Sequence, residues 1–131
     1  MKKKGILNKH ISEVVASLGH KDTLVIADAG LPIPAETQRI DLALTEGIPP
    51  FLETLRVVLE EMQVEEAIVA EEMKSVSPQV FEEVNRILGD VPIKAVPHEM
   101  FKEHTRSAKA VIRTGEFTPY ANVILTSGVV F

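Results

Sequence analysis

The stretch LGHKDTLVIADAGLPIP, Leu18 to Pro34, places an ionisable residue near each end of a short apolar run. The run TLVIA is short, apolar and bounded by turn residues, so we predict a buried strand over Leu24–Ala27. His20 precedes this strand and Asp28 follows it directly. Two prolines in Gly30–Pro34 remove backbone donors and exclude both helix and central strand there. The stretch therefore predicts a strand that separates two chemically active side chains.

Outside this stretch, apolar residues recur with helical spacing in several segments. NKHISEVVASLG predicts a helix with Asn8 as its N-cap and Gly19 as the residue that ends it. PPFLETLRVVLEEM, residues 49–62, predicts a second helix. A third is expected from Ser77-Pro78 to Gly89, and a weaker one over residues 99–108.

Further strands are expected between these helices. They cover residues 39–47, Ala67–Ala70, 91–98, 109–115 and 120–131. Strands that alternate with helices predict an α/β fold, a single three-layer domain over residues 1–131 with helices on both faces of a mostly parallel or mixed sheet. The two neighbouring strands at the end can pair antiparallel, which favours the mixed form.

Composition narrows the class of protein. The chain has 131 residues, 45% of them apolar and 25% charged, as in ordinary globular proteins. A net charge of −5 with interleaved signs disfavours a nucleic-acid-binding surface. Without cysteine there is no disulfide framework and no thiolate metal site. MKKKG does not open a signal peptide, and no run of about 18 apolar residues is present, so we expect no membrane insertion and a cytoplasmic protein.

Several polar residues lie where a ligand would bind. In parallel α/β sheets, ligands bind outside the carboxyl ends of strands, and Asp28 and His98 each follow a predicted strand. Lys102 comes four residues after His98, and we expect both to face the same side of a helix. Tyr120 and Asn122 begin the last strand and are expected on one face. This mixture of donors and acceptors suits a polyhydroxylated ligand and proton transfer.

Each of these residues also has a structural interpretation. Asp28 can cap a turn, and His20 can be a solvated residue beyond a helix C-terminus. Equally ordinary are a structural His98, a surface Lys102, and a turn closed by Tyr120 and Asn122. His10 and His104 are expected at the surface. We expect no metal, because His98 and His104 lack the i, i+4 spacing and a clear third ligand. Phosphate-binding glycine motifs are also missing.

Two long segments together carry a resemblance to a known family. MKKKGILNKHISEVVASLGHKDTLVIADAGLPIP at the start and TGEFTPYANVILTSGVVF at the end resemble the D-ribose pyranase family, which is related to the fucose mutarotases. The resemblance covers essentially the whole chain. It implies that the protein interconverts the pyranose and furanose forms of D-ribose without a cofactor. The furanose form would then be the substrate of a ribokinase. It also implies a homodecamer of two stacked pentameric rings with active sites at subunit boundaries.

The resemblance assigns roles to residues as well. His20, in LGHKD, matches the catalytic histidine of the family. The ligand-binding positions match Asp28 in ADAG, His98 in VPHE, and Tyr120, Ala121 and Asn122 in PYAN. Lys102 matches a position that lines the same cleft.

The predicted strand poses a geometric problem for these roles. A strand rises about 3.3 Å per residue, so Leu24–Ala27 alone keeps its ends about 10 Å apart. Either the flanking turns fold the two residues together, or His20 of one chain and Asp28 of another serve one sugar. We favour the second arrangement. Two alternatives remain: a non-catalytic sugar-binding auxiliary of transport, and a structural ring-forming protein with Val129–Phe131 at its interface.

Overall fold

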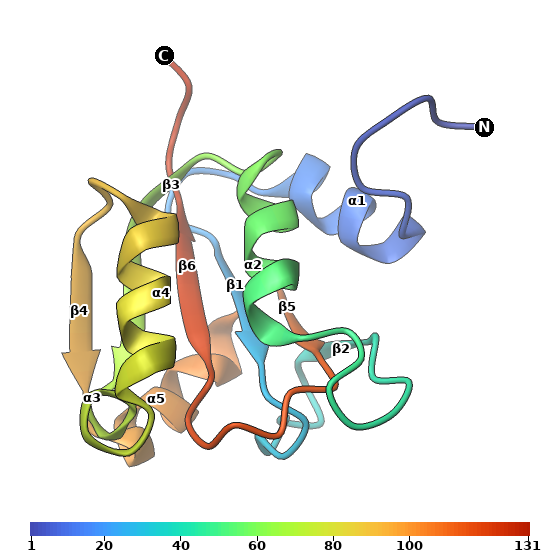
Figure 1. Ribbon diagram of the computed structural model, residues 1–131. Coiled ribbons are helices and arrows are strands. Elements are labelled where there is room, and N and C mark those ends of the chain that lie inside the picture. The colour runs from blue at the N-terminus through green and yellow to red at the C-terminus, as the bar shows by residue number, and fades with distance from the viewer.

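The strand at the centre of the quoted stretch lies in the middle of a six-stranded mixed sheet (Figure 1). A computed structural model describes residues 1–131. The strand order is β2-β5-β1-β6-β3-β4. The strands are β1 (Thr23–Ala27), β2 (Gln38–Asp41), β3 (Val64–Ala70), β4 (Ile93–Val96), β5 (Ala110–Arg113) and β6 (Val123–Ser127). β6 is antiparallel to both of its neighbours, and all other pairs are parallel.

Helices cover both faces of this sheet (Figure 1). They are α1 (Lys9–Ser17), α2 (Phe51–Leu59), α3 (Glu71–Val76), α4 (Pro78–Leu88) and α5 (His98–His104), and the short 3₁₀ turn η1 (Thr105–Ser107) follows α5. The larger core lies under α1, α2 and α4, and the smaller core lies under α5. The predicted α/β domain with a mixed sheet between two helical layers is therefore confirmed.

Alternation along β1 connects the two cores. Leu24 and Ile26 point into the larger core, whereas Val25 and Ala27 point into the smaller one. All four residues are fully buried. Burial of a Val, Leu or Ile side chain contributes about 1.5–3 kcal/mol, so both faces of this strand stabilise the fold.

The first helix has the predicted ends, whereas one helix was not predicted. Asn8 caps α1, with Ile11 N donating to its Oδ1 at 2.9 Å, and α1 ends at Ser17 with Leu18 as its C-cap. Gly19 is the next residue, at the predicted C′ position, and its N–H donates to Asp22 Oδ2 at 2.8 Å. The helix α3 was not expected, and it follows β3 without a connecting loop.

The predicted strand over residues 39–47 is wrong beyond Asp41. The chain turns at Gly47, whose φ of 76° favours glycine, and Leu44 is 78% exposed. The partner strand β5 ends at Arg113, so residues after Leu42 have no strand to pair with. The alternating pattern in this segment therefore continues past the end of the ladder.

The strand directions define two edges of the sheet. At the carboxyl edge, five strands end, and the segment that leads into β6 begins there. At the opposite edge, which we call the amino edge, the same five strands begin and β6 ends. Asp28 lies at the carboxyl edge and His20 lies before β1 at the amino edge. The fold therefore places the two residues at opposite ends of β1.

Candidate active site

A cleft of about 550 Å³ opens at the carboxyl edge. It contains three of the residues predicted from the sequence, Asp28, His98 and Tyr120. Arg113, which ends β5, and Glu116 line it as well. The remaining lining comes from the loop after Asp28 and from the segment before Tyr120: Ala29, Gly30, Leu31, Pro32, Phe117, Thr118 and Pro119. Segments far apart in the chain thus bring a carboxylate, an imidazole, a phenol and a guanidinium to one cavity.

Asp28 is held in this cleft by hydrogen bonds to both of its oxygens. Asn122 Nδ2 donates to Asp28 Oδ2 at 2.9 Å, and Gly30 N donates to Oδ1 at 2.9 Å. The backbone N–H of Asp28 donates in turn to Asn122 Oδ1 at 2.8 Å. Asn122 is only 1% exposed, and Ala121 is fully buried beside it. Within one chain, Asn122 therefore orients Asp28 from behind and does not line the cleft.

His98 and Tyr120 form one wall of the cleft. Their rings meet edge to face, with centroids 5.0 Å apart. The backbone N–H of His98 donates to the Glu72 carboxylate at 3.1 and 3.2 Å, which fixes the start of α5. Tyr120 has a φ of 61°, an uncommon conformation for a bulky residue. His98 Nδ1 is buried without a hydrogen-bond partner. The chain thus fixes both rings while leaving a polar atom of the imidazole unused.

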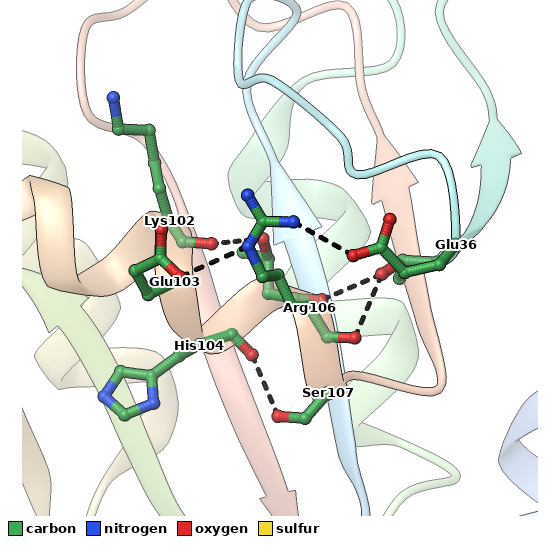
Figure 2. Close-up of polar contacts among 8 residues, drawn as sticks. Glu36, Lys102, Glu103, His104, Arg106 and Ser107 are labelled. Atoms are coloured by element: carbon green, nitrogen blue, oxygen red, sulfur yellow. Dashed lines mark hydrogen bonds and ion pairs between the residues drawn. The ribbon is translucent and has the colours of Figure 1, made fainter.

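Lys102 lies outside this cleft. Its Nζ pairs with Glu99, one helical turn earlier, at 2.9 Å, and it lines a neighbouring hollow beneath Pro32–Pro34. His98 and Lys102 are four residues apart in α5, and within one chain they line different hollows. Figure 2 shows the Lys102 side chain extending away from the pair formed by Arg106 and Glu36, whose N–O distance is 3.0 Å. Its match to a cleft-lining position stays a prediction.

The contacts in Figure 2 anchor the loop that follows Asp28. Arg106 bridges Glu36, in the loop, and Glu103, on α5. Thr37 Oγ1 donates to the Thr105 carbonyl at 3.1 Å. These bonds tie the segment between β1 and β2 to the end of α5, so the loop that lines the cleft at residues 29–32 is anchored at its far end as well as at Asp28.

His20 lies in a different hollow, at the amino edge. This hollow, of about 460 Å³, is lined by the end of α1 and by the C-terminal residues Val129–Phe131. His20 Nε2 is 2.9 Å from Glu65 Oε2, and Lys21 pairs with the same carboxylate. About half of the His20 side chain, 49%, is exposed. No arrangement of a single chain in this fold brings His20 to Asp28.

Two cleft residues were missed from the sequence. Arg113 Nε donates to the Ala29 carbonyl at 3.0 Å, and its Nη1 donates to both Asp41 oxygens at 3.2 Å. It therefore ties the loop after Asp28 to the end of β2. The signal was available, because Arg113 is a polar residue at the carboxyl end of a predicted strand, the same criterion that selected Asp28.

Glu116 organises the segment before Tyr120. Its Oε1 accepts from Phe51 N at 3.0 Å, at the start of α2, and its Oε2 accepts from Thr118 Oγ1 at 2.8 Å. Burial alone would raise the pKa of Glu116, but the hydrogen bonds from Phe51 and Thr118 outweigh it and hold the pKa below its usual value. The contact with Thr118 is local, but no sequence pattern predicts the contact with Phe51, which lies 65 residues away in the chain.

The sheet order and the cleft can now be compared with known proteins. The model of the RbsD / FucU transport protein family matches residues 1–130. The chain belongs to this family. The sequence resemblance and the predicted fold class are both confirmed by RbsD of Bacillus subtilis, solved in complex with D-ribose. That structure superposes with a TM-score of 0.97 at 50% identity and full coverage of both chains.

Relatives within the RbsD / FucU family are similar over their whole length. The D-ribose pyranase of Geobacillus thermodenitrificans is 61% identical over 131 residues, which cover 100% of this chain and 99% of that protein. The D-ribose pyranase of Coprothermobacter proteolyticus is 60% identical and fully covered on both sides. The fucose mutarotase of Streptococcus pneumoniae, solved with L-fucose, shares the fold at a TM-score of 0.83, with 23% identity and 95% coverage of each chain.

Two other properties of this family member follow from its coordinates. The longest helix, α4, has 11 residues, and none of the helices could cross a bilayer. His, Asp and Glu side chains are nowhere gathered in a group of three that could hold a metal ion.

Proposed function

We propose that the chain is a D-ribose pyranase that interconverts the pyranose and furanose forms of D-ribose. The observation that carries the proposal is the cleft, in which Asp28 is fixed by Asn122 opposite a wall of His98 and Tyr120. Full-length relatives named D-ribose pyranase and the ribose complex of RbsD support the choice of sugar. The furanose product would be used by a ribokinase in the cytoplasm.

The reaction needs proton transfer and no electron transfer. A base removes the proton of the anomeric hydroxyl while the bond between the anomeric carbon and the ring oxygen breaks, and an acid protonates that oxygen. The open-chain aldehyde is then attacked by a different hydroxyl, with the proton transfers reversed. An imidazole can both accept and donate protons near neutral pH, which suits His20. Positioned acid–base groups typically accelerate a reaction by about 10²–10⁴-fold.

We assign the complete site to two chains. His20 and Asp28 lie at opposite edges of the sheet, so a sugar bound at Asp28 can meet His20 only from a neighbouring subunit. Large apolar side chains are exposed at both edges, as expected for surfaces that pack in an assembly: Leu44, Ile48 and Phe117 at one and Val129, Val130 and Phe131 at the other. The assembly we propose is the decamer of two pentameric rings.

Exchange spectroscopy on ribose tests the activity directly. The wild-type protein should speed magnetisation transfer between pyranose and furanose signals, and His20→Ala should abolish the acceleration while fold and assembly size stay unchanged. His104→Ala is the matched control, because His104 is exposed and lines neither hollow. Ribose binding without any acceleration by the wild type would replace the proposal with the non-catalytic sugar-binding auxiliary.

A further inference from the structure

The amino edge contains an irregularity in β3 next to His20. Val64 pairs with Ser127 and Glu66 pairs with Thr126, so Glu65 is the extra residue of a β-bulge. Bulges redirect a side chain that regular alternation would place elsewhere. Here the bulged residue brings a carboxylate oxygen to 2.9 Å from His20 Nε2.

The turn that carries His20 is held by hydrogen bonds of the residues before and after it in the chain. Lys21 has a φ of 75°, and its backbone N–H donates to the Ser127 carbonyl at 2.9 Å. Ser127 N donates back to the Asp22 carbonyl at 2.8 Å, and the Asp22 side chain accepts from Gly19 N at 2.8 Å. The contact between His20 and Glu65 is therefore built on a backbone that both strand ends hold in place.

The two oxygens of Glu65 have different partners. One pairs with Lys21 and the other with His20. Hydrogen bonds from Lys21 and His20 hold the pKa of Glu65 below its usual value, so the group is a carboxylate at neutral pH. A carboxylate only accepts hydrogen bonds, so His20 Nε2 must be the donor. The hydrogen bond to Glu65 uses His20 Nε2, and Nδ1 lies on the other side of a ring whose side chain is 49% exposed.

We infer that Glu65 is a positioning residue that holds neutral His20 in the tautomer protonated on Nε2, so that Nδ1 exchanges protons with the sugar. This inference rests on the proposed function and names the atom that performs it. Lys21 occupies the other oxygen of Glu65, which leaves a single oxygen to orient the ring. Carboxylates that contact one imidazole nitrogen fix the tautomer and orientation of the ring in the same way in other enzymes.

The tautomer can be measured directly in the intact assembly. Two-bond proton–nitrogen correlations of ¹⁵N-labelled histidine distinguish a protonated ring nitrogen from a bare one. The chain has four histidines, and the signals missing in His20→Ala identify His20. We expect neutral wild-type His20 to carry its proton on Nε2. A proton on Nδ1, or an even mixture, would overturn the inference without any variant of Glu65.

The variant Glu65→Gln tests the catalytic consequence. Its amide can donate as well as accept, so the Nδ1-protonated form should become populated, and kcat should fall about 10- to 100-fold while KM changes less than about twofold. Glu66→Gln, the same change one residue further, is the control and should match the wild type in both. Glu65→Asp should recover part of the lost kcat.

Each remaining outcome also decides the question. A Glu65→Gln protein with wild-type tautomer and wild-type kcat would show that Glu65 does not position the ring. If Glu65→Gln fails to assemble, the wild-type tautomer and the kcat of Glu65→Asp decide. An inactive wild type would overturn the proposed function, and with it the role of Nδ1, even if the proton lies on Nε2.

Discussion

The polar residues at the two edges of the sheet differ in how many hydrogen bonds hold their side chains. At the carboxyl edge, Asp28 is bonded through both oxygens and is backed by the buried Asn122. At the amino edge, His20 has one side-chain partner, Glu65, and half of its side chain is exposed. A cleft that is fixed within one chain is suited to bind, whereas a ring held on one side can face a second molecule. The contrast fits the proposal that each subunit contributes a binding half-site and a catalytic half-site.

The largest expected effect comes from separating the two half-sites. His20→Ala and Asp28→Ala should each lower the rate of ribose ring exchange by at least about 10²-fold. When the two proteins are dissociated, mixed equally and reassembled, about one site in four should contain both native residues if each site takes its two chains at random from the mixture. Exchange spectroscopy should detect that recovery. A mixture that stays as inactive as its components would mean that no site is shared.

A smaller effect is expected from the support behind Asp28. Asn122→Ala leaves the Asp28 N–H and one carboxylate oxygen without their partner. We expect the free energy of unfolding to fall by about 1–3 kcal/mol and ribose to bind more weakly. Urea unfolding at fixed protein concentration and ribose titration measure the two changes. Asn85→Ala, on the exposed face of α4, is the control and should stay within about 0.5 kcal/mol.

The next prediction concerns Arg113, which links the loop after Asp28 to the end of β2 at the carboxyl edge. Arg113→Lys cannot keep the bond to the Ala29 carbonyl and the pair of bonds to Asp41 together. We expect the binding free energy of ribose to weaken by about 1 kcal/mol, which should raise KM by about fivefold with kcat nearly unchanged. Steady-state exchange rates at several ribose concentrations measure it, with Arg39→Lys as the control. An equal loss in kcat would place Arg113 in the chemical step instead.

The smallest effect is a dependence of stability on pH that comes from Glu116. Its pKa in the folded protein lies below the unfolded value of about 4.3. Its contribution to stability is therefore complete above about pH 4.3 and is lost as the pH falls through the folded pKa. The difference in unfolding free energy between wild type and Glu116→Gln should shrink at acid pH. The exposed Glu13→Gln should show no such trend, and a difference that stays constant with pH would contradict the assignment.

Much of the carboxyl edge could be predicted from the sequence. The buried strand over Leu24–Ala27 was recognisable from its apolar run, and the position of Asp28 after it followed from strand topology. The same criterion selected His98, and strand alternation selected Tyr120, which lines the same cleft. The positions of these residues could be predicted because each depends on a local pattern and on one general property of parallel sheets.

The features that were missed depend on contacts between distant segments. The bulge at Glu65 results from the pairing of β3 with β6, and no local sequence pattern near Glu65 predicts it. The opposite positions of His20 and Asp28 followed from strand length, although the residue that orients His20 did not.

The reversed direction of β6 has a consequence for how the molecule forms. β6 is the only strand that joins β2-β5-β1 to β3-β4, and it follows the other five in the chain. During synthesis the two parallel halves can be made but cannot be joined until residues 123–127 have left the ribosome. The strand β6 begins next to Asn122, which bonds Asp28, and it ends at Ser127, which bonds the turn that contains His20. The groups that we propose for binding and for catalysis therefore acquire their final positions together, when β6 pairs with its neighbours.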